Sequence, residues 1–441
     1  MVVSPTIGAL APGLGSGKRY SMVKPVRAVA AVALASMALA ACGGSGSGSG
    51  GSGDAGGGKK LVISTDLPLQ GQAKDASEST NKAIELYLKQ VSNKAGNYTV
   101  ELKKYDDSTA TAGKWDPGKC ESNANDHVAN TAEVAIMGTY NSGCAQIQVP
   151  ILNRAPMLMV SHANTNPGLT KAWDANEPQK YQVSGQKSYA RVITTDDYQG
   201  SAAAQFAAQK LGVKKLYILN DNEVYGKGVA RALEAEAKKL GIEVLGNEPW
   251  DAKQTNYTAL YSKIKSMNPD MVYLAGIYDN NGGQLVKDKV SVLGDNTKVK
   301  LMGPDGFTGY PELDKLQQGQ GMYLTFAGLS TDQLKQGGGA AAKLLSDYKA
   351  EYGADPASSY ALYGVAGVQV ILAAIEKSDG TRQGILDQIF KGSGITIPAD
   401  KSAIGKELKI DPQTGDTSAK DISVLVLKDG NETFVQAQPV S

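Results

Sequence analysis

Residues 214–245 read KKLYILNDNEVYGKGVARALEAEAKKLGIEVL and contain one strand–helix–strand unit. Residues 215–219 and 242–245 are short apolar runs of strand length, and the apolar residues of 229–240 recur at helical spacing. Two such strands around a helix are typical of a parallel sheet that helices cover on both faces. The polar stretch 220–226 follows the first strand, where sheets of this kind bind their ligands.

The same alternation extends along most of the chain. Apolar runs of strand length occur in two series, at 61–65, 100–105, 134–137 and 157–160, and at 215–219, 242–245, 271–275 and 299–302. Helical periods lie between many of these runs, and the two series are separated near residues 195–200. The sequence therefore predicts an α/β protein of two doubly wound parallel-sheet lobes. Residues 59–441 are long enough to bury two cores.

The first 41 residues contain lysines and arginines but no acidic residue. Their apolar stretch 28–41 is shorter than the roughly 20 residues that a membrane-spanning helix needs, but it suits a secretory signal. The stretch ends in Leu39-Ala40-Ala41-Cys42, which resembles a bacterial lipoprotein signal, in which the cysteine is acylated. We therefore expect a lipoprotein signal peptide at 1–41, with Met1 or Met22 as the start. The alternative is a plain signal peptide.

Residues 43–58, directly after Cys42, are almost entirely glycine and serine. Such a segment cannot bury apolar surface, and it would span about 22 Å as a flexible chain. We interpret 42–58 as a lipidated cysteine and a tether that holds a globular body at the outer face of the cell membrane.

Composition excludes several classes of function. The 45 basic and 44 acidic residues give a net charge of +1, which disfavours a nucleic-acid partner. Three cysteines and two histidines leave little material for a metal site, so we expect no metal and no cofactor. The segment 13–18 looks like a phosphate loop, but Pro12 replaces its first glycine and Arg19 its Ser/Thr.

Polar residues follow the predicted strands and form the list of candidate ligand contacts. In the first series they occupy 138–142 and 161–167, which offer hydroxyl and amide groups. In the second series they occupy 220–226, 276–279 and 303–306, which offer tyrosines and a carboxylate. The carboxyl ends of parallel strands are where such sheets bind ligands.

With these motifs in this order, the body resembles type I periplasmic binding proteins of ABC transporters, and within them the leucine/isoleucine/valine-binding family. The resemblance covers about residues 59–427. It is carried by 61–71, 138–142, 161–167, 196–200, 221–228 and 302–306. It implies two lobes joined by three crossovers, which close on a ligand in the cleft. The lobes would comprise 59–197 plus 327–404, and 198–326 plus 405–441.

The resemblance also implies how a ligand would be held. Ser142, Ala163 and Thr165 match the residues that bind the ligand's carboxylate, and hydroxyl and N–H donors near helix N-termini suit an anion. The alternative for Ser142 and Thr165 is a helix N-cap. Asp305 matches the family's carboxylate for the ligand's ammonium group, which is commonly glutamate. Its alternative is a turn residue in Gly-Pro-Asp-Gly.

Four further residues enter the predicted ligand-binding set through the same resemblance. Tyr225 matches a tyrosine of the second lobe, and Tyr278 lies one position after the residue that strict counting aligns with the family's aromatic, Ile277. Tyr363 matches a residue in a helix returning to the first lobe, with a core position as its alternative. Asp196 is expected at a crossover, where it would serve closure or the hinge.

One stretch departs from the family pattern. Relatives often place an aromatic residue after the first strand, where this chain reads Ala73-Lys74-Asp75-Ala76. A branched aliphatic ligand is therefore in doubt, and a larger or more polar amino acid, an amide or a urea-like molecule is an alternative. Relatives have a disulfide near Cys120 and Cys144, and exported proteins favour disulfides. The alternative for this pair is two free thiols.

The predicted function is that of a monomeric, lipid-anchored substrate-binding protein, which delivers a small amino acid or related zwitterion to the permease subunits of an ABC importer. The ligand-binding component of a sensor system is the alternative. An exported hydrolase is disfavoured, because no Gly-x-Ser-x-Gly, His-Glu-x-x-His or Ser-x-x-Lys arrangement stands in a catalytic context in the body.

Overall fold

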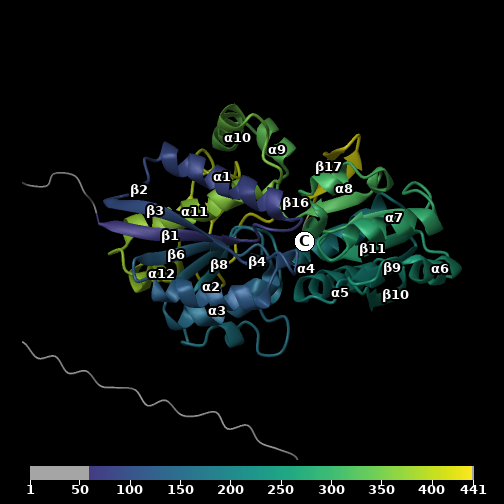
Figure 1. Ribbon diagram of the computed structural model, residues 1–441, viewed down its shortest axis with the longest axis horizontal. Coiled ribbons are helices and arrows are strands. Elements are labelled where there is room, and N and C mark those ends of the chain that lie inside the picture. Colours follow the sequence, from purple (N-terminus) through teal and green to yellow (C-terminus); the bar gives the residue numbers. More distant parts are fainter. Residues whose placement is uncertain (1–58, 440–441) are drawn as a thin grey trace, which may run out of the picture. The chain divides into compact units, whose positions relative to one another are not determined.

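Two separate sheets organise residues 59–439, which are the part of the chain that the computed structural model describes. Each sheet is the centre of one α/β lobe (Figure 1). The first sheet consists, in spatial order, of β2 (Lys94–Ala95), β3 (Tyr98–Asp106), β1 (Lys60–Leu67), β6 (Glu133–Gly138), β7 (Leu158–Ser161) and β8 (Tyr189–Arg191). All neighbouring pairs except β2–β3 are parallel.

Helices cover both faces of the first sheet. Helices α1 and α11 pack against each other on one face, and α2 and α3 pack together on the other (Figure 1). The helices of this lobe are α1 (Lys74–Gln90), α2 (Pro117–Ala129), α3 (Ser142–Arg154), α9 (Thr331–Gln336), α10 (Gly339–Tyr352), α11 (Tyr360–Lys377) and α12 (Arg382–Phe390). Two short antiparallel pairs complete it: β4 (Ser108–Thr109) with β5 (Lys114–Trp115), and β14 (Thr396–Ile397) with β15 (Leu408–Lys409).

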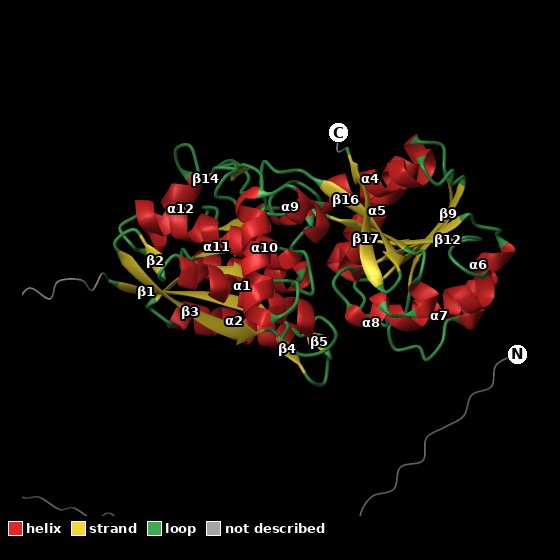
Figure 2. Cartoon of the chain, turned by 90° about the horizontal axis from the view of Figure 1, so that it is seen from above, coloured by secondary structure: helices red, strands yellow, loops and turns green. Residues whose placement is uncertain are grey.

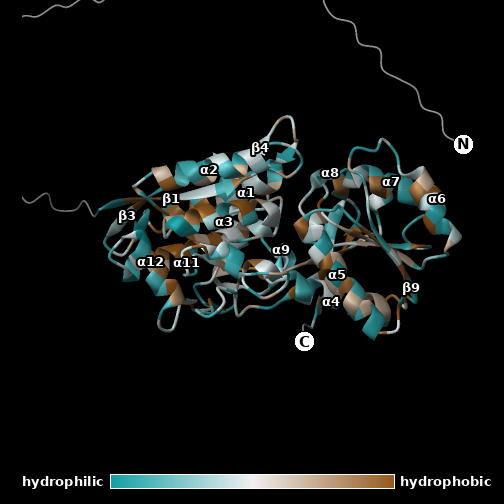
Figure 3. Ribbon diagram, turned by 90° about the horizontal axis from the view of Figure 1, so that it is seen from below, coloured by the Kyte–Doolittle hydropathy of each residue, from teal (hydrophilic) through white to brown (hydrophobic). Residues whose placement is uncertain are grey.

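The second sheet is parallel in its first five strands and antiparallel at one edge. Its strands, in spatial order, are β10 (Glu243–Pro249), β9 (Lys215–Asn220), β11 (Met271–Ala275), β12 (Lys300–Gly303), β13 (Tyr323–Phe326), β16 (Ile422–Lys428) and β17 (Asn431–Gln438). Helices α4 and α5 pack together on one face, and α6 and α7 on the other (Figure 3). The helices are α4 (Asp196–Gln209), α5 (Val224–Lys239), α6 (Thr258–Ser266), α7 (Gly282–Leu293) and α8 (Pro311–Asp314).

The central strands are buried on both faces, which explains why they read as continuous apolar runs. All residues of β6, β7, β8 and β11 are buried. Helix α11 is apolar enough to resemble a membrane span, but 83% of that window is buried in the first lobe, as expected for a core helix. In Figure 3 the hydrophobic colour lies mainly on strands and inward helix faces. All eight strands predicted from the sequence are present, with small shifts at their ends.

Three crossovers connect the lobes, as the fold class predicted. The chain passes from β8 to α4 through residues 192–195, and from β13 to α9 through residues 327–330. It returns to the second sheet at β16 through residues 417–421. Ligand-dependent closure in such folds bends crossover segments of this kind.

The third crossover lies later in the chain than the boundary at 404/405 that we placed from the sequence. Residues 405–416 remain beside the first lobe, because β15 pairs with β14. The Arg191 N–H also donates to the Gly415 carbonyl (2.9 Å), and Arg191 Nε lies 2.9 Å from Asp416 Oδ1. The contacts therefore assign 405–416 to the first lobe.

Candidate ligand-binding site

A small cavity lies between the lobes, next to the carboxyl ends of the parallel strands. Its volume is about 20 Å³, roughly the space that one water molecule needs. Both lobes line it, the first through Tyr140, Asn141, Ser142, Ala163 and Tyr360, and the second through Glu223, Tyr225, Ile277, Asp305 and Gly306. Four predicted ligand-binding residues therefore meet here: Ser142, Ala163, Tyr225 and Asp305.

The first-lobe side of the cavity presents neutral hydrogen-bonding groups. Asn141 is the N-cap of α3 and Ser142 is the first residue of that helix, so both lie at the positive end of its dipole. Ser142 Oγ accepts the Asn166 N–H at 3.3 Å, which leaves its own proton available for donation. Ala163 follows β7, and its N–H donates to Ser161 Oγ at 3.2 Å.

The second-lobe side of the cavity contains a buried carboxylate. Asp305 begins the short 3₁₀ turn after β12 and is 1% exposed. The hydroxyl groups of Tyr225 and Tyr360 each donate to one of its oxygens, the first from α5 and the second across the cleft from α11. No cationic side chain of residues 59–439 forms an ion pair with it. Burial raises the pKa of Asp305, and the tyrosine hydrogen bonds act in the opposite direction.

Tyr360 is a cleft residue that the sequence analysis missed. It lies one helical turn before Tyr363, the residue of this helix that we predicted from the sequence. Its ring packs edge-on against Tyr140, His162 and Phe326, with centroids 5.2, 5.8 and 4.9 Å away. This packing orients its hydroxyl group toward Asp305.

His162 lies beside the cavity and is fully buried, and neither ring nitrogen has a hydrogen-bond partner within residues 59–439. Burial lowers its pKa to about 3, so the ring is neutral at physiological pH. His162 therefore contributes aromatic packing rather than charge to this side of the cleft.

Asp196 and Thr165 lie near the cavity without lining it. Asp196 starts α4 directly after the first crossover, and its N–H donates to the Thr165 carbonyl at 2.9 Å. Both side chains are buried, and the Asp196 carboxylate and Thr165 Oγ1 have no hydrogen-bond partner in the described chain. Burial raises the pKa of Asp196 well above its usual range, and the nearby Asp305 charge adds to this.

Tyr278 and Tyr363 do not line this cavity, so their contact with a ligand stays a prediction. Ile277 lines the cavity, and the next side chain, Tyr278, packs on Phe307 and Tyr310 instead. The Tyr363 hydroxyl accepts the Leu329 N–H at 2.6 Å and so supports the second crossover.

Glu223 is a second carboxylate at the cavity that the sequence analysis did not select. It is the N-cap of α5, in extended conformation, at the end of the polar stretch after β9. Lys114 Nζ, from β5 of the first lobe, lies 2.5 Å from Glu223 Oε1. The Trp115 indole N–H donates to Glu223 Oε2 at 3.2 Å. Its position in the polar stretch that follows β9 is the sequence feature that could have identified Glu223 as a site residue.

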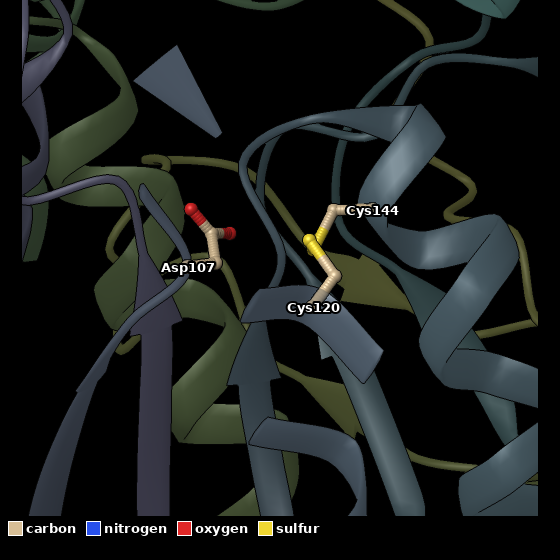
Figure 4. A group of neighbouring side chains, drawn as sticks. All are labelled: Asp107, Cys120 and Cys144. Carbon is tan, nitrogen blue, oxygen red and sulfur yellow. A yellow bond between two sulfur atoms is a disulfide. The ribbon is translucent and has the colours of Figure 1, made fainter. Parts of the chain in front are cut away.

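The predicted pairing of Cys120 with Cys144 is confirmed: a disulfide joins α2 to α3, beside Asp107 (Figure 4). Asp107 and these cysteines are the one group of three potential metal ligands among residues 59–439. Both sulfur atoms are already bonded to each other, so the group offers no thiolate. Residues 1–41, Cys42 and 43–58, for which we predicted a signal peptide, an acylated cysteine and a tether, lie outside the described residues.

The fold and the geometry of the site agree with the protein family that the sequence matches. The profile of the periplasmic binding protein family matches residues 65–408. The chain belongs to this family, in its type I, branched-chain amino acid group. The family and the fold are those of extracytoplasmic substrate-binding proteins.

Individual relatives have low sequence identity to this chain, but the matches extend over long stretches of it. A Leu/Ile/Val-binding protein of Rhizobium johnstonii is 26% identical over 82% of this chain and 90% of its own length. The Leu/Ile/Val/Thr-binding protein of Salmonella typhimurium is 29% identical, but the match covers 46% of this chain and about half, 49%, of that protein.

Solved structures of low sequence identity share the fold. A leucine-binding protein of Thermotoga maritima has a TM-score of 0.69 at 22% identity, covering 86% of this chain and 98% of that chain. A solute-binding protein of an ABC transporter from Rhodopseudomonas palustris HaA2, in complex with p-hydroxybenzoic acid, has a TM-score of 0.71 at 17% identity, with the same coverage.

Proposed function

We propose that the chain is the extracytoplasmic substrate-binding subunit of an ABC importer. Its ligand is a small zwitterion, an amino acid or a related amide, bound between the lobes. It is a carrier and not an enzyme, and it acts as a monomer that passes its ligand to permease subunits. The amino-acid-binding names of several relatives support this class of ligand.

The observation that carries the proposal is the environment of Asp305. This carboxylate is buried at the cleft and accepts hydrogen bonds from neutral tyrosine hydroxyls, with no cation paired to it in the described chain. A buried charge is costly unless it is paired, and a ligand ammonium group would supply the missing partner. Hydrogen bonds between charged groups are about twice as strong as neutral ones.

The opposite side of the cleft suits the other end of a zwitterion. The Ser142 hydroxyl, the start of α3 and the loop of Ala163 and Thr165 supply neutral donors for a ligand carboxylate. An aromatic acid, which a solved neighbour binds, has no cationic group for Asp305. Its binding would leave that carboxylate unpaired, so the site favours an amino acid.

The cavity has room for about one water molecule, so a ligand enters as the lobes separate and is enclosed when they close. Outside the described residues, acylation of Cys42 would anchor the protein, and 43–58 would let the lobes reach the permease. A Cys42→Ser variant should then be recovered in the soluble fraction rather than with membranes.

A thermal-shift screen of the common amino acids and small amides, followed by calorimetry, tests the proposal. We expect a ligand of micromolar affinity or tighter, and Asp305→Asn should weaken its binding at least about tenfold, which corresponds to 1.4 kcal/mol. Glu243→Gln is the matched control, because it neutralises an exposed carboxylate on β10 of the same lobe. Equal affinity in both variants, or no ligand in the panel, would contradict the proposal.

A further inference from the structure

Two carboxylates line the cleft, and they have different partners. Asp305 is hydrogen-bonded by neutral tyrosines, whereas Glu223 is paired with a lysine of the other lobe. Among the described residues that line the cavity, none is a lysine, arginine or histidine. The charge that a ligand meets therefore depends on how completely Glu223 is neutralised.

Lys114 makes two contacts across the cleft. It belongs to the short β4–β5 pair, which lies at the end of the first lobe that faces the second (Figure 2). Its Nζ lies 2.5 Å from Glu223 Oε1 and donates to Asn280 Oδ1 at 2.5 Å. The Trp115 N–H binds the other Glu223 oxygen, so adjacent residues of one strand hold both ends of this carboxylate.

The remaining neighbours of Glu223 do not neutralise it. The Asn280 amide donates to Glu223 Oε1 at 2.9 Å and to Asp221 Oδ2 at 3.0 Å, and it is uncharged. Asp221 is itself acidic, and burial together with the Glu223 charge raises its pKa to about 7. Within residues 59–439, Lys114 is the one cationic side chain in an ion pair with Glu223.

We propose that Lys114 determines the charge selectivity of the cleft, an inference that rests on the proposed function. With Lys114 in place, Glu223 is neutralised and Asp305 is the single uncompensated carboxylate of the lining. The cleft then selects an amino acid with one ammonium group and a neutral side chain. Without Lys114, Glu223 becomes a second anionic contact, and a ligand with a second cationic group is favoured.

The pair is placed to affect ligand choice more than folding. The Lys114 and Glu223 side chains are 28% and 18% exposed, so solvent screens their attraction in part. A ligand enclosed in the closed cleft is less well solvated, and an unpaired charge beside it matters more there. Because the two residues belong to different lobes, the pair forms when the lobes are in contact.

Calorimetry of the full-length protein with L-lysine, L-arginine, L-ornithine and the neutral amino acids tests the inference. We expect the wild type to prefer a neutral amino acid. Lys114→Met should shift the ratio of dissociation constants toward the basic amino acids by about tenfold. Adding Glu223→Gln to Lys114→Met should restore the wild-type ratio, because no free carboxylate then remains at this position.

Lys104→Met is the matched control. It removes one positive charge from a pair with Glu85 (2.6 Å) that lies wholly in the first lobe, so the ratio should stay at the wild-type value. Thermal unfolding of each variant confirms that it is folded. A folded Lys114→Met protein with an unchanged ratio, an equal shift in Lys104→Met, or a wild type that prefers basic amino acids overturns this inference alone. A wild type that binds no amino acid or amide overturns the proposed function and this inference with it.

Discussion

Two groups of buried carboxylates, one in the core of the first lobe and one at the cleft, have partners that differ in kind. In the core of the first lobe, Asp66 accepts from the side-chain amides of Asn123 (2.9 Å) and Gln148 (2.5 Å). His127 bridges two acidic groups there, with Nε2 3.3 Å from Asp66 and Nδ1 2.5 Å from Glu133. This core network contains its own titratable base and needs nothing from outside.

The cleft contains the opposite arrangement. Asp305 accepts from neutral hydroxyls, and the Asp196 carboxylate has no hydrogen-bond partner in residues 59–439. Burial raises the pKa of both groups, which reflects the cost of keeping these charges without a cation. Burial of a carboxylate therefore does not by itself indicate function. A missing cation at a cleft does, because a ligand can supply it.

The largest expected effect is on the free energy of unfolding, when one aspartate in each region is replaced by asparagine. Asp66→Asn removes a charge on which His127 depends, and it should lower the free energy of unfolding by about 3–5 kcal/mol. Asp305→Asn in ligand-free protein should change it by less than about 1 kcal/mol, because one tyrosine hydroxyl can donate to the amide oxygen while the other accepts from the amide N–H. Urea denaturation at pH 7 measures both. Equal losses would show that the two regions are structurally equivalent.

A second prediction concerns the disulfide that joins the two regions. It links α2, which carries His127, to α3, whose first turn carries Ser142. The double variant Cys120→Ser, Cys144→Ser should lose about 2–4 kcal/mol of unfolding free energy, because the unfolded chain is no longer cross-linked. Reductant should destabilise the wild type but leave the variant unchanged. Amide hydrogen exchange at the start of α3 should also become faster. Unchanged exchange there would show that the disulfide stabilises the core of the first lobe but not the cleft.

A third prediction follows from His127. Burial alone would lower its pKa, but hydrogen bonds with Asp66 and Glu133 outweigh this and raise it above the usual value. A raised folded-state pKa means that the added stability is fully present below the unfolded value, about pH 6.5, and is lost as pH rises through the folded value.

Each unit by which the pKa of His127 is raised on folding adds up to about 1.4 kcal/mol to the free energy of unfolding. The wild type should therefore lose stability as the pH rises from 6 to 9, as measured by the urea midpoint. His127→Gln should be less stable than the wild type at pH 6 and approach it at pH 9. A difference in stability between the two proteins that stays constant from pH 6 to 9 would contradict the prediction that His127 is protonated at the lower pH.

The fold could be predicted because it depends on many residues at once. Each strand and helix is specified by several apolar residues with the right period, so a single misplaced residue does not change the topology. The third crossover was placed too early because residues 405–416 have no strong period. Their position depends on contacts with Arg191, which is distant in sequence.

The cleft could be predicted only in part, because single side chains decide it. Ser142 and Asp305 follow strands within motifs, and both line the cavity. Tyr360 and Tyr363 lie on the same helix and are both buried, so the pattern of burial does not distinguish them. The role of Glu223 depends on its ion pair with Lys114, and the two residues are 109 positions apart in the sequence.

The smallest expected effect separates these two tyrosines of α11. Tyr360→Phe removes a donor to Asp305, so the carboxylate is less well oriented for a ligand ammonium group, and affinity should fall by about two- to twelvefold, equivalent to 0.5–1.5 kcal/mol. Tyr363→Phe removes the acceptor of the Leu329 N–H instead, so it should reduce unfolding free energy by a similar amount with unchanged affinity. Calorimetry and urea denaturation of the two variants make a matched pair, since each loses one hydroxyl from the same helix. If Tyr363→Phe weakened binding as much as Tyr360→Phe, the prediction would be wrong. Ligand binding would then depend on the packing of α11 as a whole and not on the Tyr360 hydroxyl group at Asp305.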